Sequence, residues 1–338
     1  MFFGTPAFAV PSLDVLLASS HTVVGVVTQP DRPRGRGHKT SDAPVKARAV
    51  EAGIPILQPD RMKDPALLEA LSAWKADLGV VAAYGRILTD AILAIPRLGM
   101  INVHGSLLPR YRGAAPIHRA IIEGESSTGI TIMRVVKALD AGPMLAKDRR
   151  AIGPDETSED VERDMAQIGA RLLITVVDQI AAGSAQDTPQ EEALATYAHR
   201  LTRDDGVIDW NWPAPRIHNL IRGLHPWPHA FGFIGGKRVI LRRSAVGAEV
   251  FEAGAPDGGP RRTPPPPGTI IDADGDRLIV ATGDGVLRLV EIQAEGKRPM
   301  TAREFLSGHR LAAGDRFESA VRLPPAPSGS GGTGTTGR

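Results

Sequence analysis

Two polar side chains, Asn102 and His104, lie two residues apart in a run that is typical of a β-strand, Met100–His104. Side chains alternate between the faces of a strand, so this amide and this imidazole point the same way. A parallel strand covered on both faces is expected to be apolar, and buried polar groups cost free energy unless a site uses them. The glycine and the turn that follow put the pair at the carboxyl end of the strand, where open α/β sheets bind ligands. The pair therefore predicts a ligand site, although either residue alone would be read as a hydrogen-bonded core residue.

The elements that must position this pair alternate between strands and helices over residues 1 to about 150. The predicted strands are residues 22–28, 77–83, 100–104 and 128–136. The predicted helices include residues 11–19, 43–52 and 64–75, and a long amphipathic helix over 159–182 closes the unit. Such alternation predicts βαβ units and a mostly parallel sheet covered on both faces. We expect this first domain to span residues 1–188.

The second part of the chain has a different pattern. Residues 189–205 are expected to be a linker, and residues 206–318 contain closely spaced short β runs with a two-residue hairpin turn at Gly235-Gly236. These runs predict a small all-β barrel or sandwich. Composition predicts disorder near 254–268, which contains four consecutive prolines, and in the tail over 319–338.

Only Met1, Phe2 and Phe3 precede the turn at Gly4-Thr5-Pro6. The first strand of a βαβ protein normally lies in the middle of its sheet, and three residues are few for that position. We therefore expect that the natural start lies upstream and that Met1 stands where a GTG codon encodes Val.

The composition limits the possible functions. The chain has 338 residues, 42% of them hydrophobic, which suffices for two domains with cores, and its net charge of +2 is too small for nonspecific nucleic-acid packaging. It has no cysteine, which excludes a disulfide framework, a thiolate nucleophile and thiolate metal sites. No G-x-G-x-x-G follows a first strand, which argues against a general NAD dehydrogenase. No run approaches the roughly 20 apolar residues that span a bilayer, so we expect a cytoplasmic protein with no membrane partner. We also expect the protein to be monomeric.

The chain reads NVHGSLLPRYRGAAP from Asn102 onward. This segment closely resembles the active-site segment of the 10-formyltetrahydrofolate-dependent formyltransferases. Other runs resemble the same family in the expected order over residues 2–317: GTPAFAV, TQPDRPRGRGHK, VVAAYGRIL, TGITIMRVVKALDAGPML, VIDW, LHPWP and ATGDGVLRLVEIQAEGKRPM. The resemblance implies an α/β, Rossmann-like formyltransferase domain followed by a small OB-like barrel. The periodicity described above agrees with this fold class.

The resemblance also implies a reaction, the transfer of a formyl group from N10 of 10-formyltetrahydrofolate to the α-amino group of methionine on initiator tRNA. The formyl oxygen gains negative charge as its carbon becomes tetrahedral, and positioned hydrogen-bond donors stabilise that charge. The catalytic residues implied are Asn102 and His104 as donors and Asp140, from Leu139-Asp140-Ala141-Gly142, beside the imidazole. Without the resemblance, an Asp before a glycine turn would be interpreted as an Asx-turn residue. No metal is implied.

Two further sets of residues are expected to bind substrates. The folate is expected to contact Ser106, Leu107, Leu108, Pro109, Tyr84 and Ile87. Tyr84 and Ile87 could equally be packing residues. Residues 29–48 carry six basic and two acidic side chains around Pro-Arg-Gly-Arg-Gly, which predicts a long loop. The tRNA is expected to contact Arg34, Arg36 and Lys39 of this loop and Lys237 and Arg238 of the barrel.

Three other functions compete with this interpretation. Formyltransferases that act on glycinamide ribonucleotide or on an amino-sugar nucleotide share the NVHGSLLP segment, but the basic loop together with the barrel favours tRNA. An RNA-binding protein without catalysis would not need Asn102, His104 and Asp140 together.

Overall fold

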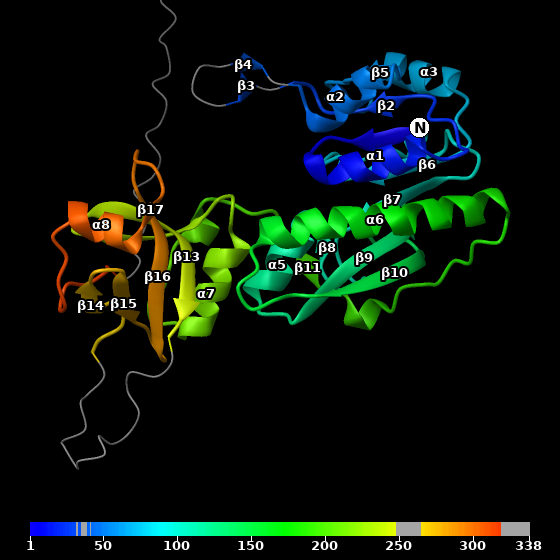
Figure 1. Cartoon of the computed structure of the whole chain (residues 1–338). Helices are drawn as coiled ribbons and strands as arrows, with labels where there is room; N and C mark the ends of the chain where they lie inside the picture. The colour runs from blue at the N-terminus through cyan, green and yellow to red at the C-terminus, as the bar shows by residue number, and fades with distance from the viewer. Residues whose placement is uncertain (32, 35–38, 41, 248–264, 319–338) are drawn as a thin grey trace, which may run out of the picture. The chain divides into compact units, whose positions relative to one another are not determined.

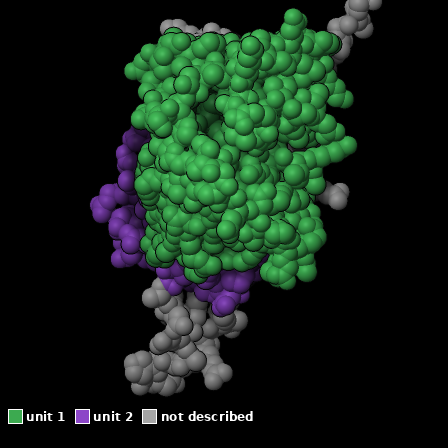
Figure 2. Space-filling model, turned by 90° about the vertical axis from the view of Figure 1, so that its right-hand side faces the viewer, with its two compact units in different colours: residues 1–206, 218–230 green, residues 207–217, 231–338 purple. Residues whose placement is uncertain are grey.

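The computed structural model describes residues 1–31, 33–34, 39–40, 42–247 and 265–318. The chain divides into two compact units. Unit 1 comprises residues 1–206 and 218–230, and unit 2 comprises residues 207–217 and 231–338 (Figure 2).

Unit 1 is built on a seven-stranded sheet with the order β10-β9-β7-β6-β1-β2-β5. The strands are β1 (Phe2–Gly4), β2 (Val26–Val27), β5 (Ile56–Leu57), β6 (Gly79–Ala82), β7 (Met100–His104), β9 (Ser127–Arg134) and β10 (Met144–Ala151). The five strands β5, β2, β1, β6 and β7 run parallel to one another. At one edge of the sheet, β9 pairs antiparallel with β7, and β10 pairs antiparallel with β9. This arrangement confirms the predicted mostly parallel sheet.

Helices cover both faces of this sheet (Figure 1). They are α1 (Val10–Leu17), α2 (Pro44–Glu51), α3 (Pro65–Ala73), α4 (Asp90–Leu93), α5 (Pro116–Ile122) and α6 (Ser158–Ala181). The three-residue strand β1 lies in the middle of the sheet, and its successive side chains enter different cores. Phe2 packs with residues of α1 and α6, whereas Phe3 packs with residues of α3. Both rings are fully buried, so this short strand joins the two helical layers.

The long helix α6 confirms the prediction for residues 159–182 to within one residue at each end. Its first turn is fixed by a capping box in which Thr157 and Asp160 exchange hydrogen bonds. A Cβ atom on Gly169 would lie 2.9 Å from the Val103 side chain, so this glycine lets α6 approach β7 closely. The helix thereby supports the strand that carries Asn102 and His104.

Three parts of unit 1 differ from expectation. The strand predicted over 22–28 is only β2, because its neighbour β5 offers just two residues to pair with it. Strand β10 escaped prediction because it is an edge strand whose middle, residues 147–150, is charged. The expected linker, residues 189–205, lies in unit 1 and contributes β11 (Tyr197–Ala198), which pairs in parallel with β8 (Arg112–Gly113).

Unit 2 is the predicted small β domain, and its strands pair antiparallel. Its sheet has the order β12-β13-β16-β15-β14, with β17 paired to β16. The elements are β12 (Ala230–Ile234), β13 (Lys237–Val246), β14 (Ile270–Asp274), β15 (Arg277–Ala281), β16 (Val286–Ala294), β17 (Met300–Thr301) and α8 (Ala302–Gly308). Helix α7 (Ala214–Gly223) begins in unit 2, and its residues from 218 onward belong to unit 1. Gly235 and Gly236 form the predicted hairpin turn with positive φ angles of 55° and 68°.

Residues 316–318 link the two ends of this sheet. Glu318 pairs with Phe233 of β12 in an isolated antiparallel β-bridge. Arg316 pairs in the same way with Thr269, which precedes β14. Between them, Phe317 is fully buried and its ring lies 4.9 Å from that of Trp210. The segment closes the sheet on itself, as expected for a small barrel.

Two predicted disordered segments fall mainly outside the described residues, namely 254–264 and 319–338. Residues 265–268 are described, and Gly268 donates a backbone hydrogen bond to Ala281 and accepts one from Phe317. This end of the proline-rich segment is therefore part of the folded domain.

Candidate active site

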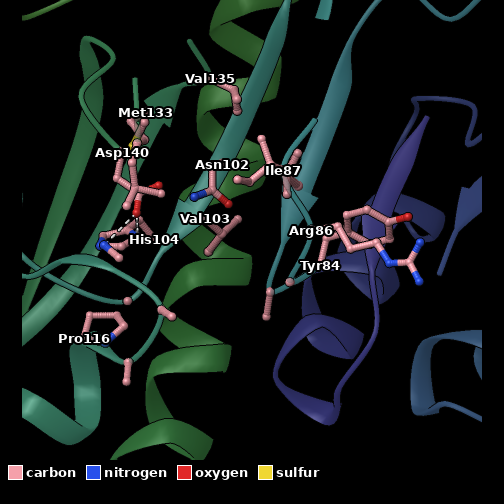
Figure 3. Close-up of a pocket in the computed structure, with 18 of the residues that line it drawn as sticks. Tyr84, Arg86, Ile87, Asn102, Val103, His104, Pro116, Met133, Val135 and Asp140 are labelled. Atoms are coloured by element: carbon pink, nitrogen blue, oxygen red, sulfur yellow. Dashed lines mark hydrogen bonds and ion pairs between the residues drawn. The ribbon is translucent and has the colours of Figure 1, made fainter. Parts of the chain in front are cut away.

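A cavity of about 540 Å³ opens beside the carboxyl ends of β6 and β7 (Figure 3). It is lined mainly by the turn after β6 (83–88), the end of β7 (102–105), the start of α5 (113–118) and the turn after β9 (135–140). This volume is in the range of sites that hold cofactor-sized ligands. The position agrees with the prediction that a ligand binds at the carboxyl end of residues 100–104.

Asn102 and His104 enter the cavity from the same side of β7, as strand alternation predicts (Figure 3). The intervening Val103 side chain packs in the core against α6. In the part of the chain that the structure describes, the Asn102 amide makes no hydrogen bond. Its two N–H groups are therefore available to a ligand in the cavity.

The His104 ring is buried, with 5% of its surface exposed, and its two nitrogens have different surroundings. Nε2 lies 2.9 Å from the carbonyl oxygen of Tyr111, which can only accept, so Nε2 carries a hydrogen and donates it. Nδ1 lies 3.7 Å from Oδ2 of Asp140. Nδ1 is therefore the ring nitrogen that faces the Asp140 carboxylate.

Asp140 lies in the turn between β9 and β10 and has a φ angle of +47°, in the left-handed region. Its Oδ2 atom accepts a hydrogen bond of 2.8 Å from the Gly113 amide. A Cβ atom on Gly142 would lie 1.9 Å from the Arg134 carbonyl oxygen, so this turn can close on β9 only with a glycine there. The structure thus brings Asn102, His104 and Asp140 together, as the resemblance implied.

Tyr84 and Ile87, two of the residues expected to contact the folate, lie in different environments. The Tyr84 ring packs edge-on against Phe3, its hydroxyl donates to the Met62 sulfur, and burial raises its pKa to about 12. Ile87 is 84% exposed and lines the cavity, as do two other exposed apolar residues, Val136 and Leu139. Of the two candidates, only Ile87 presents its side chain for a ligand to cover.

The structure does not bring Ser106, Leu107, Leu108 and Pro109 to this cavity. The Ser106 hydroxyl donates to the Arg110 carbonyl, and the Leu108 amide donates to Thr131. The Leu108 side chain packs with Met133 and Met144. These residues shape the turn after β7, and the direction of their side chains could not be read from the strand pattern because the strand ends at His104.

Some lining residues were not predicted. Ala114 and Ala115 fall inside the RGAAP part of the matched segment, and Val136–Leu139 precede Asp140 in the matched turn, so the motif contained a signal for them. The sequence contained no such signal for His118 and Glu162, because they reach the cavity only through the packing of α5 and α6.

The expected tRNA-binding residues are distributed over both units. Arg34 in β3 (Pro33–Arg34) is the register partner of Lys39 in β4 (Lys39–Thr40), so the expected loop contains a short antiparallel pair. Arg36 lies outside the described residues. Lys46, from the same basic stretch, is neutralised by Asp31 and Asp42.

In unit 2, Lys237 is exposed at the start of β13. The guanidinium of its neighbour Arg238 lies 4.1 Å from the centre of the Phe231 ring. That cation–π contact gives Arg238 a packing role within unit 2.

His118 gives the protein an acid-sensitive stability. Burial, with a contribution from Arg119, lowers its pKa from 6.5 to about 4, so between these values the unfolded chain binds more protons than the folded one. The free energy of unfolding should therefore fall as the pH is lowered from 6.5 to 4. We expect His118→Gln to lose less stability over this window, measured by urea unfolding. His199→Gln, at an exposed histidine, is the control, and equal pH dependence of parent and His118→Gln would contradict the assignment.

The chain is similar to known proteins over most of its length. Residues 1–177 match the family model described as Formyl transferase, and residues 200–310 match the one described as Formyl transferase, C-terminal domain. A methionyl-tRNA formyltransferase of Roseiflexus sp. (strain RS-1) is 44% identical over 326 residues, which is 96% of each chain. A protein of the same name from Sorangium cellulosum (strain So ce56) is 43% identical over 93% of this chain and 97% of its own.

Solved structures share the fold at low sequence identity. WlaRD, a sugar 3N-formyl transferase crystallised in the presence of dTDP and 5-N-formyl-THF, has a TM-score of 0.63 at 17% identity and covers 88% of this chain and 97% of its own. An N-formyltransferase from Helicobacter canadensis in complex with folinic acid and dTDP-3-aminofucose also has a TM-score of 0.63, at 16% identity, over 87% of this chain and 98% of its own.

Two features are absent from the described residues. None of their His, Asp and Glu side chains gather in groups of three that could hold a metal ion. None of their helices has the length and apolar character needed to cross a bilayer.

Proposed function

Because this chain belongs to the formyl transferase family, we propose that it transfers the formyl group of 10-formyltetrahydrofolate to the α-amino group of methionine on initiator tRNA. The observation that carries the proposal is the meeting of Asn102, His104 and Asp140 at one cavity. Its support is the 42–44% identity, over more than nine-tenths of the chain, to relatives named methionyl-tRNA formyltransferase. We further propose that the chain acts as a cytoplasmic monomer.

In the proposed reaction the α-amine attacks the formyl carbon, and the bond from that carbon to N10 of the folate breaks. The formyl oxygen carries negative charge in between. The Asn102 amide donates one hydrogen bond to it. Because Nε2 of His104 is committed to Tyr111, the second donor would be an N–H at Nδ1, the ring nitrogen beside Asp140. Donors fixed in place for the charged oxygen stabilise the transition state more than the substrate.

Protons must also move in this step. The amine loses one proton, and N10 of the leaving folate gains one. An α-amine titrates near 8, so a useful fraction is already neutral at pH 7 and a weak base is enough. Asp140, whose carboxylate lies beside His104, accepts the amine proton through a water molecule, and this proton is then passed to N10 of the leaving folate. No nucleophilic serine or covalent intermediate is required.

The folate is proposed to enter through the apolar mouth of the cavity. Ile87 lies on the turn after β6, and Val136 and Leu139 lie on the turn after β9, so a flat ring placed between the two turns would cover all three. The polar edges of the ring would be held by backbone groups of these turns. The expected contacts of the folate with residues 106–109 stay a prediction, and these residues are not among those that line the cavity.

The tRNA is proposed to be held by the basic residues named above: Arg34, Arg36, Lys39, Lys237 and Arg238. RNA is recognised most readily at unpaired or weakly paired ends, which suits entry of the 29–48 segment at the acceptor stem. Contacts of lysine and arginine with phosphates would make binding weaker at high salt.

One assay tests the reaction and its acceptor together. Purified protein is mixed with 10-formyltetrahydrofolate and one of three acceptors: charged initiator Met-tRNA, glycinamide ribonucleotide or water. We expect fast transfer to the charged tRNA alone. Transfer to glycinamide ribonucleotide instead would retain the Asn102–His104–Asp140 chemistry and overturn the assignment of the acceptor. Absence of transfer to any acceptor would overturn the proposal.

The basic segment supplies a separate prediction. Arg36→Ala should raise KM for the charged tRNA about tenfold, because each lost phosphate or base contact removes roughly 1–3 kcal/mol, while KM for the folate stays unchanged. Arg171→Ala, at an exposed arginine on α6, is the control. An unchanged KM for tRNA would mean that the segment is a solvated charged loop without a role in binding.

A further inference from the structure

The turn that carries Asp140 has few hydrogen bonds of its own. Asp140 has a positive φ angle, and the turn's one internal backbone hydrogen bond, from Ala141 to Ala138, is long at 3.4 Å. The carboxylate itself is tied to protein by the Gly113 amide. A non-glycine residue in the left-handed region persists only where its surroundings hold it there. The conformation of Asp140 must therefore be fixed from outside the turn.

Gln190, fifty residues further along the chain, supplies that support. Its Nε2 atom donates one hydrogen bond of 2.7 Å to the Asp140 carbonyl and another of 2.8 Å to the Gly142 carbonyl. Both amide hydrogens of the side chain are thus used on the two residues that flank Ala141. The Gln190 side chain therefore holds the backbone of the turn at two points, one on each side of Ala141.

Arg112 fixes the orientation of this amide. Its Nε and Nη2 atoms donate to Oε1 of Gln190 at 3.0 Å and 2.9 Å. Arginine can only donate and a carbonyl can only accept, so the oxygen of Gln190 must face Arg112 and the nitrogen must face the turn. The Arg112 side chain is only 2% exposed, and an ion pair with Glu192 at 2.9 Å keeps its charge paired and raises its pKa.

The same support reaches Asp140 by a second route. Arg112 directly precedes Gly113, whose amide binds the Asp140 carboxylate. The Arg112 backbone is in turn held by hydrogen bonding to Thr196 and by the pairing of β8 with β11. The backbone and the carboxylate of Asp140 are therefore both anchored on Arg112 and its immediate neighbours.

We propose that Gln190, oriented by Arg112, is a positioning residue that holds the Asp140 carboxylate against His104. The inference rests on the proposed function, because it concerns the same reaction. Gln190 itself is absent from the cavity lining among the described residues, so it acts through Asp140 rather than on the substrates.

The test uses Gln190→Glu in the full chain. Glutamate has nearly the same size and keeps Arg112 as its partner, but an oxygen replaces the nitrogen that donates to the Asp140 and Gly142 carbonyls. We expect kcat to fall about 10- to 100-fold, as for displacements of about 1 Å in a catalytic group, with little change in KM for the folate or the tRNA. Gln167→Glu, at an exposed glutamine on α6, controls for the added charge.

A double-mutant cycle separates positioning from a general structural effect. If Gln190 acts through the Asp140 carboxylate, Gln190→Glu should cost little further kcat in a chain that already carries Asp140→Asn. Equal losses in both backgrounds, or an unchanged kcat in the single variant, would overturn the inference. If Gln190→Glu fails to fold, as judged by thermal unfolding, Gln190→Met is measured in the same cycle.

An assay of the unmodified protein distinguishes failure of the proposed function from failure of this inference. If the parent transfers formyl groups to another amine, the cycle is measured with that acceptor and still decides the role of Gln190. If the parent transfers to no acceptor, the proposed function is overturned, and with it the inference that depends on that reaction.

Discussion

Replacing Asn102 by alanine should lower kcat for formyl transfer about 10²- to 10³-fold, the usual cost of removing one donor to a charged transition-state oxygen. The fold should tolerate the change, because the amide is only partly buried and makes no hydrogen bond to the described part of the chain. KM for the folate should change little, because the lost interaction strengthens only in the transition state.

Asn102→Asp sharpens this prediction. Aspartate has the same shape, but an acceptor oxygen replaces the donor and a negative charge faces the developing oxyanion. Its kcat should therefore fall at least as far as that of Asn102→Ala. The measurement is single-turnover transfer with saturating folate and charged tRNA, and near-parent rates for either variant would remove Asn102 from the donor role.

Asp140→Asn should lower kcat about 10²- to 10⁴-fold, the range usually found when a general acid–base group is lost. An asparagine oxygen can still accept the hydrogen bond from the Gly113 amide, so the turn should keep its conformation. What disappears is the charge 3.7 Å from the His104 ring and the ability to take up a proton. The His104 ring then has a neutral neighbour at Nδ1 in place of a carboxylate.

The control for Asp140→Asn is Asp148→Asn, at an exposed position on β10. It makes the same chemical change on a neighbouring strand and should leave kcat unaltered. A comparison with Asp140→Ala separates charge from geometry, because alanine also loses the bond to Gly113. Asp140→Asn with kcat close to the parent would show that neither the charge nor the proton acceptor is needed.

The sequence was most informative where a repeating pattern continued through a whole element. The run from Met100 to His104 predicted a strand with the observed bounds, and alternation placed the amide and the imidazole on one face. The pattern of α6 predicted a long helix because its apolar positions recur over 24 residues. The antiparallel strands of unit 2 were marked by turn residues such as Gly235-Gly236.

Contacts between distant parts of the chain were harder to predict. Asp140 follows His104 by 36 positions, and only the matched motif linked the two. Gln190 and Arg112 are 78 residues apart in the chain. Arg112 belongs to the matched segment, but Gln190 did not stand out, because a glutamine in a polar stretch is an ordinary surface residue by type. Their burial and their shared hydrogen bonds appear only after β8 has paired with β11.

The bridges made by Arg316 and Glu318 bear on the order in which the nascent chain matures. Unit 1 consists of residues up to 230, so it can become compact while the rest of the chain is still being synthesised. The sheet of unit 2 cannot close until Phe317 has emerged from the ribosome and its ring has packed against Trp210. Before that moment the edges of β12 and β14 remain open to pairing with other chains. Termination of synthesis upstream of Arg316 would thus release a chain with a finished catalytic half and an aggregation-prone second half.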